Sequence, residues 1–293
     1  MKTCILVLSL MPALISADDF WETFQDGQVA EISSYKTVQP RYGEDRKAET
    51  ILIFVPEHVS RTTRIKVEDY SAVPEENQVQ VVKLNRVLRF NTGMYDYAAM
   101  TSVFTPLHKD TASLPLKISL AVTEWCGNFY THLLPQENGA KHVMHSYFQS
   151  EGDKHDFIEG KAEALYEDNL PILIREFNGA FMKEGEKRRM TIMPSLWMSR
   201  ITHKTLGFEK GWIKKGSLAD LEVGEMSVKA RRWEWRLSER TSIYWTEADY
   251  PHRIVKWEMS NGEKGELVRT VYKAYWALKD KQDNDWRDTL GLD

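Results

Sequence analysis

Three side chains that can do chemistry lie close together in residues 124–135, EWCGNFYTHLLP: Glu124, Cys126 and His132. A cysteine becomes a nucleophile when a base within about 3 Å takes its proton or lowers its pKa. Apolar residues alternate over 116–122, which predicts a strand with one apolar face. Continued to the end of the stretch, the alternation turns Glu124 and Cys126 toward the protein interior.

We expect Gly127 and Asn128 to form the turn that follows this strand. On the returning strand His132 would then lie several residue pairs from Cys126, beyond hydrogen-bond reach. An isolated buried carboxylate is costly, so we expect Glu124 to pair with an inward arginine or lysine. The stretch therefore favours a structural role, with Cys126 as a small buried residue at a strand end.

Two alternatives stay open for the same stretch. A thiol enzyme would use Cys126 with Glu124 and a histidine distant in sequence such as His145, or with His132 if the hairpin differs from our expectation. Alternatively, the stretch would form the edge of a ligand pocket.

A second chemical pattern is the pair of histidines in HVMH, His142 and His145. A spacing of three places both rings on one side of a helix but on opposite faces of a strand. Because we expect strand or irregular loop here, a metal site built on this pair is only a weak alternative, and we predict no cofactor. Ser195 in MPSLW also lacks the flanking glycines of a nucleophile elbow.

The chain of 293 residues opens with MKTCILVLSLMPALISADD, a basic residue and a short apolar run followed by small residues. This pattern is typical of a secretory signal peptide, and we expect residues 1–17 to be cleaved after Ala17 and the protein to act in the periplasm or outside the cell. A retained N-terminal anchor is the alternative, although the run is shorter than the about 20 residues of a membrane helix.

Cleavage would remove Cys4 and leave Cys126 as the single thiol. It would also change the formal net charge of −4 to −5 by removing Lys2. An acidic chain without a basic stripe is a poor partner for nucleic acid.

Period-two alternation of apolar and polar residues recurs along the chain and predicts many β-strands. The Asn-Gly of SNGE, residues 260–263, lies between two such runs and predicts a hairpin with a type I′ turn. The clearest runs are 28–39, 49–55, 63–69, 78–90, 116–125, 188–193, 227–238, 241–246, 252–260 and 266–278.

One segment, 160–178, shows helical spacing. It divides into two halves, and Asn169 and Pro171 suit the start of the second half as cap and first-turn residue. We therefore expect an all-β fold, either a strongly curved antiparallel sheet or a barrel-like two-sheet body, with one short helical segment. We expect a single β-rich domain, 18–278, with lobes 18–159 and 180–278 as the alternative. The polar tail, 279–293, should be loosely ordered.

Aromatic residues are abundant, with 10 Trp, 12 Tyr and 11 Phe. Trp233 and Trp235 would share a strand face, while Tyr244 and Trp245 are adjacent. Such stripes fill cores more often than they bind ligands, but they would also line an apolar pocket.

Four stretches, QPRYGEDR (39–46), NTGMYDY (91–97), EWCG (124–127) and YPHRIVKWE (250–258), together make the chain resemble an uncharacterised family of exported β-rich bacterial proteins. The resemblance covers nearly all of the mature chain and implies no established activity. Related chains carry a Maf-type septum-formation-inhibitor label, which this sequence does not support because the Ser-x-Ser-Pro-Arg-Arg stretch of that enzyme is absent. In architecture alone, the chain also looks like envelope proteins that wrap a curved sheet around lipid or acyl ligands.

The sequence therefore predicts an exported, non-enzymatic envelope protein that binds an apolar or amphipathic ligand such as a lipid, or an envelope partner protein, in the concavity of its sheet. The thiol enzyme is one alternative, and a structural module without a ligand is another. The predicted ligand-binding residues are Glu124, Trp125, Trp233, Trp235, Tyr244 and Trp245.

Overall fold

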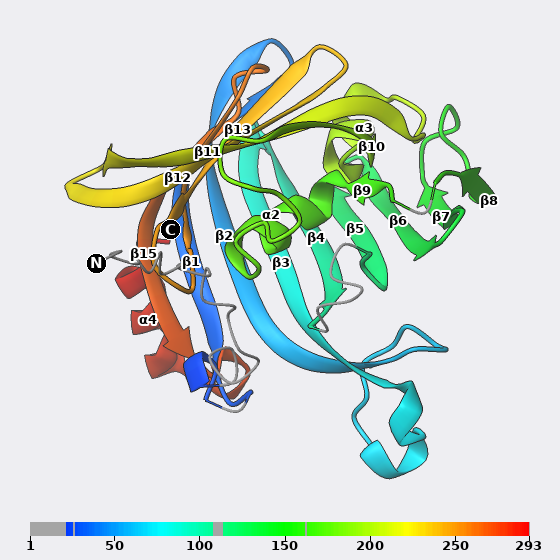
Figure 1. Ribbon diagram of the computed structural model, residues 1–293, viewed down its shortest axis with the longest axis horizontal. Helices are drawn as coiled ribbons and strands as arrows, with labels where there is room; N and C mark the ends of the chain where they lie inside the picture. Colours follow the sequence, from blue (N-terminus) through cyan, green and yellow to red (C-terminus); the bar gives the residue numbers. More distant parts are fainter. Residues whose placement is uncertain (1–21, 26, 108–113, 162, 293) are drawn as a thin grey trace, which may run out of the picture.

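The computed structural model describes residues 22–25, 27–107, 114–161 and 163–292 and is built mainly from one sheet of fifteen strands (Figure 1). The signal peptide predicted for 1–17 lies outside these residues. The sheet curves strongly without closing, which confirms the all-β class and the curved antiparallel sheet, and it is one sheet rather than two. The strands are β1 (Ala30–Arg41), β2 (Glu44–Ser60), β3 (Gln78–Thr92), β4 (Tyr95–Pro106), β5 (Lys117–Glu124), β6 (Gly127–Gln136), β7 (Gly139–Ser146), β8 (Lys154–Glu159), β9 (Leu165–Tyr166), β10 (Lys187–Met193), β11 (Glu209–Val223), β12 (Met226–Leu237), β13 (Arg240–Glu247), β14 (Ile254–Met259) and β15 (Lys264–Lys273).

The sheet consists of two meanders joined by their first and last strands. Its order is β8-β7-β6-β5-β4-β3-β2-β1-β15-β14-β13-β12-β11-β10-β9, and every neighbouring pair is antiparallel except β9 and β10. Ala30 on β1 pairs with Lys273 on β15, so the two halves of the chain share one hydrogen-bonded surface. Whether they behave as one domain or as two lobes stays a prediction.

The β14–β15 hairpin confirms the pairing predicted around SNGE, but not the turn type. The Met259 amide donates to the Glu263 carbonyl at 2.8 Å, which closes a three-residue loop, 260–262, rather than a two-residue turn. Within it Gly262 has a φ of 95°, and Asn261 does not adopt positive φ. The predicted strand over 63–69 is also wrong, since that segment forms only an isolated bridge from Lys66 to Val59.

The short helices are α2 (Leu170–Arg175), α3 (Leu196–Thr202) and α4 (Asp285–Leu290), with 3-10 turns η1 (Tyr70–Ala72), η2 (Glu75–Asn77), η4 (Glu167–Asn169), η5 (Tyr275–Ala277) and η6 (Lys281–Asn284). None of the helices in the described part of the chain is long and apolar enough to span a bilayer.

Helix α2 confirms the second half of the predicted helical segment, with Pro171 in its first turn. The first half is wrong, because Leu165 and Tyr166 form the edge strand β9. Asn169 does not cap the helix through its side chain; its Oδ1 instead accepts from Thr105 Oγ1 at 2.5 Å. The sequence analysis missed helix α3, which Ser195 caps by accepting from the Met198 amide.

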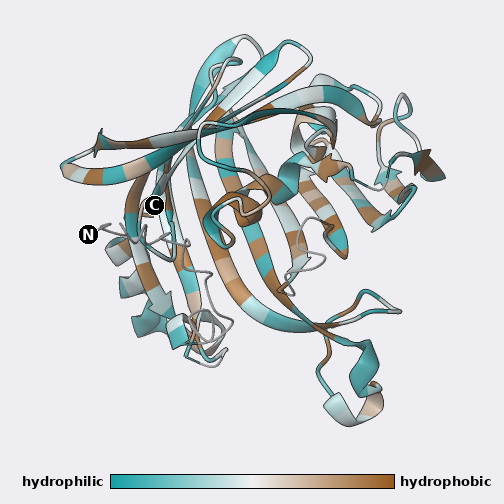
Figure 2. Ribbon diagram, in the orientation of Figure 1, coloured by the Kyte–Doolittle hydropathy of each residue, from teal (hydrophilic) through white to brown (hydrophobic). Residues whose placement is uncertain are grey.

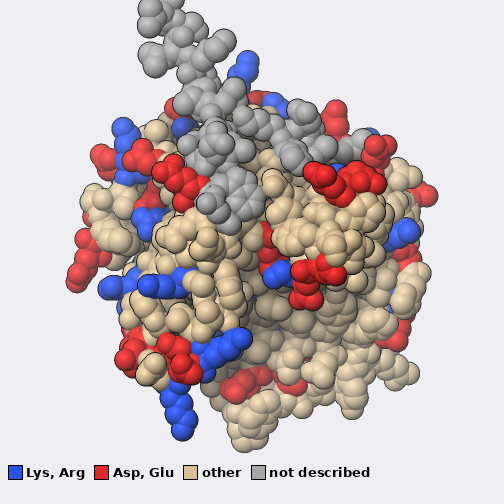
Figure 3. All heavy atoms as spheres, turned by 90° about the horizontal axis from the view of Figure 1, so that it is seen from below, with Lys and Arg blue, Asp and Glu red and all other residues tan. Residues whose placement is uncertain are grey.

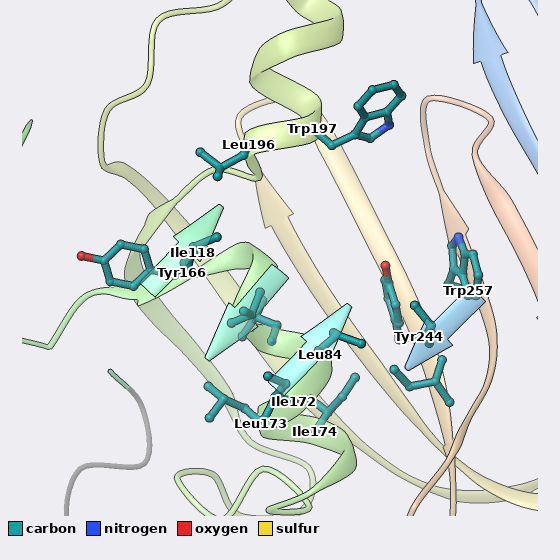
Figure 4. Packing of buried hydrophobic residues seen from close by; sticks show 14 of the residues in the cluster. Leu84, Ile118, Tyr166, Ile172, Leu173, Ile174, Leu196, Trp197, Tyr244 and Trp257 are labelled. Carbon is teal, nitrogen blue, oxygen red and sulfur yellow. The ribbon is translucent and has the colours of Figure 1, made fainter. Parts of the chain in front are cut away.

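Helices α2 and α3 lie on the concave face of the sheet and bury its apolar side chains (Figures 1 and 2). Ile172 and Leu173 of α2 and Leu196 and Trp197 of α3 are at most 1% exposed. They pack with the sheet in one large core cluster, part of which Figure 4 shows. The concavity that the sequence predicted as a ligand site is therefore largely filled by the chain's own segments 167–175 (η4 and α2) and 195–202 (Ser195 and α3), which together we call the plug.

Buried ion pairs attach the plug to the sheet at three places. Arg175 of α2 donates to Glu31 of β1 at 2.5 Å, with both side chains at most 1% exposed. Arg200 of α3 pairs with Glu124 of β5 at 3.1 Å. The third pair, Arg240 of β13 with Glu167 of η4, is described below.

The tail that we expected to be loosely ordered contains η6 and helix α4 within its described residues, 279–292. Helix α4 packs on the opposite side of the sheet, where Leu290 is 7% exposed and clusters with Ile32 and Val55. Ser34 Oγ donates to the Leu290 carbonyl at 2.6 Å, which fixes the end of the helix on β1. The tail is polar because only one side of this short helix meets the protein.

Candidate ligand site

A pocket remains between the plug and the concave face of the sheet. Its volume is about 50 Å³, or about 620 Å³ when the space that opens to solvent is included. The sheet contributes Leu52, Leu84, Arg86, Thr101, Val103, Trp235, Arg240, Tyr244, Trp257 and Met259, the β14–β15 loop contributes Glu263, and the plug contributes Glu167, Asp168, Pro171, Ser195, Trp197 and Met198.

One wall of the pocket is a stack of aromatic rings from three adjacent strands. Tyr244 of β13 stacks on Trp235 of β12, with ring centroids 4.7 Å apart and planes at 22°. Tyr244 also lies parallel to Trp257 of β14 at 6.0 Å. Trp257 covers Gly265 across the hairpin, where a Cβ would come within 2.2 Å of its ring. In Figure 4, Trp197 of α3 lies across from Tyr244 and Trp257.

Glu167 is the most fully bonded carboxylate in the pocket. Its Oε1 accepts from Trp235 Nε1 at 2.9 Å, and Arg240 donates to both of its oxygens at 2.6 and 2.5 Å. The Ser195 amide donates to its Oε2 at 3.0 Å. These bonds hold the plug against β12 and β13, so Glu167 positions the wall of the pocket.

Glu263 is bonded at one oxygen only. Its Oε1 accepts from Arg86 Nη2 at 2.7 Å and from Trp257 Nε1 at 3.2 Å. The residue is 0% exposed, and its Oε2 is buried without a hydrogen-bond partner among the described residues. Buried carboxylate oxygens nearly always accept a hydrogen bond, so this atom is an unused acceptor on a residue that lines the pocket.

Asp168 is the third carboxylate and has no arginine of its own in the pocket. Its Oδ2 accepts from the Leu196 amide at 2.8 Å. Burial raises the pKa of Asp168 to about 6, against the lowering effect of the Leu196 hydrogen bond. Burial likewise raises the pKa of the Tyr244 hydroxyl, so this tyrosine stays neutral.

Two of the six predicted ligand residues, Trp235 and Tyr244, line this pocket. Trp233 is fully buried elsewhere, and its Nε1 donates to Thr246 Oγ1 at 3.1 Å. Its ring lies so close to Gly179 that a Cβ on this glycine would be 2.2 Å from a ring carbon. Trp245 lies on the other face of β13, where Lys256 Nζ sits 5.8 Å from its ring centroid. Trp233 and Trp245 therefore do not line the pocket.

Glu124 points inward as predicted and pairs with an internal arginine, Arg200, but it lies outside the pocket. The turn that we expected at Gly127 and Asn128 is displaced, because Glu124 pairs with Gly127 and leaves Trp125 and Cys126 at the tip.

The prediction that Cys126 is buried is wrong: this free thiol is exposed. Trp125 is 65% exposed and does not line the concavity either. Three further exposed residues, Tyr42, Met94 and Tyr147, lie in connections at the same end of the sheet. This end presents apolar tips to solvent.

The histidines are arranged as strand alternation predicts. His142 is 4% exposed on the inner face of β7, with Thr131 Oγ1 at 3.0 Å and Asp156 Oδ1 at 2.8 Å. His145 is exposed and lies 3.4 Å from Asp153. The two rings lie on opposite faces of β7, and the described residues contain no group of three or more metal-ligating side chains.

His132 pairs with Ser119 along β5 and β6, several residue pairs from Cys126, as predicted. No hydrogen bond joins Cys126 to a histidine in the described part of the chain. The local geometry of a thiol–histidine pair is thus not formed at this hairpin.

The sequence analysis missed the charged residues of the pocket. Arg86 could have been found, because the alternation of Leu84, Arg86 and Leu88 places it on an apolar strand face. Asp168 and Glu263 gave no such signal, because one precedes a short helix and the other belongs to a loop.

Both signs of charge are scattered over the face that Figure 3 shows, without a large patch of one sign.

No protein family profile and no curated protein sequence matches the chain. Among solved structures, a DUF1089 family protein from Pseudomonas aeruginosa is similar at 10% sequence identity with a TM-score of 0.34. The match covers 59% of this chain and 82% of that one. A similarity of this size supports no conclusion about function.

Proposed function

We propose that this protein is an exported, non-enzymatic binding protein whose pocket takes the end of an amphipathic ligand. The observation that carries the proposal is the aromatic wall of Trp235, Tyr244 and Trp257 beside buried carboxylates, in a pocket that opens to solvent. Protein interiors are close-packed, and a wall built only for packing would leave no such space. Pockets for small molecules combine apolar walls with a few fixed polar groups, as this one does.

The size of the pocket limits the ligand. About 50 Å³ accommodates a small head group, since one water needs roughly 10–15 Å³ on this scale. A longer apolar part would lie in the open mouth, beside Met198 of α3. The ligand is thus expected to insert one end between sheet and plug rather than to fill the whole concavity.

Export is part of the proposal and is supported by the signal-like sequence of residues 1–17 and by the resemblance to exported bacterial proteins. The thiol enzyme is less well supported, because Cys126 lies at an exposed tip away from the pocket.

A pocket-filling substitution tests the proposal. Thr101 is 6% exposed and lines the pocket from β4, so Thr101→Met adds volume where the ligand would lie. Native mass spectrometry of the protein purified from a related host should show an adduct that Thr101→Met loses. Thr123→Met, the same change at an exposed position of β5, should keep it.

Three results would contradict the proposal or change it. An adduct that survives Thr101→Met would place the ligand elsewhere on the molecule. A wild-type protein without any adduct, and with no binding of added amphiphiles, would favour a structural module. A mass that retains residues 1–17 would contradict export with cleavage.

A further inference from the structure

We infer that the end of the ligand held in the pocket is an organic cation, an alkylammonium group bound between Glu263 and Asp168. This inference rests on the proposed function and names the class of ligand for the same pocket. It depends on three features of the described residues: an unused acceptor, an unbalanced charge and an aromatic wall.

The unused acceptor is Glu263 Oε2. The other oxygen of this carboxylate is already shared by Arg86 and Trp257, and the side chain is completely buried. Leaving a buried charged group partly unsatisfied is costly, so a donor is expected to complete it. An ammonium group carries three N–H donors and no acceptor, which suits an oxygen that can only accept.

The charges lining the pocket do not balance. Two arginines, Arg86 and Arg240, face three carboxylates, and each arginine is committed to one of them, Glu263 and Glu167 respectively. Asp168 is left without a paired cation, with the Leu196 amide and the Ser195 hydroxyl as its donors. A ligand carrying one positive charge would make the lining neutral, whereas an anion would add to the excess of negative charge.

The aromatic wall also favours a cation. The faces of tryptophan and tyrosine rings attract cations, and the effect grows when the cation is shielded from water. Trp235, Tyr244 and Trp257 together give a wide π surface next to the carboxylates. The methylene groups beside the ammonium would contact the same rings, so a single wall serves both parts of an alkylammonium ion.

A bound metal ion fits the pocket less well. Within the residues that the structure describes, no cluster of three or more carboxylate, histidine or cysteine side chains is positioned to ligate a metal. Two carboxylates beside apolar rings suit an organic cation, since hard metal ions prefer six or more oxygen ligands.

Three probes of equal length, hexylammonium, hexanol and hexanoate, test the inference by isothermal titration calorimetry on the full mature protein. We expect hexylammonium to bind at least about tenfold more tightly than hexanol, the ratio that one charge-assisted hydrogen bond provides, and hexanoate not to bind. Glu263→Gln places an amide donor at the position of Oε2 and should remove this preference. Glu266→Gln on the same hairpin, where the carboxylate is about half exposed, should leave it unchanged.

The outcomes separate the inference from the proposed function. If hexanol or hexanoate binds as tightly as hexylammonium, the pocket binds amphiphiles and the cation inference is wrong. If none of the probes binds at millimolar concentration, both the inference and the proposed site are wrong, and a water molecule completes Glu263. If Glu263→Gln does not fold, Asp168→Asn provides the second test. This substitution removes the other carboxylate but keeps an acceptor for the Leu196 amide. An unchanged affinity of Asp168→Asn for hexylammonium would overturn the inference.

Discussion

At the scale of single residues, the pocket contains carboxylates whose charge is only partly balanced by the protein's own side chains. Asp168 is the clearest of them. Its carboxylate is partly buried next to Glu167, and the nearest balancing charge, Arg86, is bound to Glu263. A charged carboxylate in such a place lowers the stability of the folded protein, which is common at binding sites.

Asp168 should make the stability of the protein depend on pH. Its pKa is about 6 in the folded state and about 3.8 without the fold, so the folded state binds more protons between these values. Stability is then highest below about pH 4 with respect to this group and falls as the pH rises to 6, by at most about 3 kcal/mol and less if solvent reaches the carboxylate. The groups facing it are Glu167, Arg86, the Leu196 amide and the Ser195 hydroxyl.

We therefore expect Asp168→Asn to be more stable than wild type at pH 7 and to lose the slope between pH 4 and 6. Urea denaturation at several pH values measures both quantities. Asp220→Asn, at an exposed position of β11, provides the control and should follow the wild-type curve. The role of Asp168 would be contradicted if the free energy of unfolding of the wild type rose from pH 4 to 6 and that of Asp168→Asn changed with the same slope.

At the scale of elements, the plug is held by charge as well as by apolar packing. Arg175 is the central residue at α2: it donates to Glu31 of β1 and to Glu176, its guanidinium lies 4.9 Å from the Phe54 ring centroid, and it is 0% exposed. Tyr272 of β15 donates to the same Glu31 oxygen at 2.8 Å. This network ties the plug to the seam where β1 and β15 meet.

Removing Arg175 should loosen the plug. Arg175→Met leaves Glu31 and Glu176 buried without their cation, and breaking a buried pair in this way costs about 3–5 kcal/mol. The change in urea midpoint measures the loss. Arg188→Met is the matched control, because Arg188 pairs with Glu186 at the surface and such pairs contribute at most about 1 kcal/mol. Equal effects of the two substitutions would contradict the role of Arg175.

The elements also show what the sequence could and could not predict. Alternation identified most strands, because one face of each is apolar against the plug and the periodicity is local. Alternation could not identify the plug itself. Helices α2 and α3 have six and seven residues, which is too few for a distinct helical periodicity. The spacing of apolar residues in 160–169 fits a helix as well as it fits the edge strand that forms there.

The partners of the charged residues were out of reach of the sequence for a different reason. Glu124 could be predicted to need a cation, but Arg200 is 76 positions away. Arg86 and Glu263 are separated by 177 positions. Such pairs depend on the strand order, which alternation does not specify, and so the pocket could be predicted only through its aromatic residues.

At the scale of the whole molecule, the two halves share one core. Apolar side chains of β2 to β7 and of β12 to β15 belong to the same cluster as those of the plug. Residues 18–159 alone would expose the apolar side chains of β2 to β7 that pack in one cluster with α2 and α3.

We expect a fragment of residues 18–159 to lack cooperative unfolding and to aggregate, because its concave apolar face has no cover. Size-exclusion chromatography and urea denaturation of the fragment measure this, and co-expression with residues 160–293 should restore a soluble complex. A monomeric fragment with a sharp unfolding transition would instead support two independent lobes.

The open sheet leaves two strands, β8 and β9, each with one side unpaired. Unpaired edges can recruit strands of other molecules and lead to aggregates. Strand β9 has only two residues, and β8, KHDFIE, carries four ionisable side chains in six positions. A recruited strand would gain few hydrogen bonds at β9, and the parallel, in-register stacking of copies that builds fibres would place identical charges side by side at β8. The same open sheet that holds the pocket is therefore a poor template for fibres.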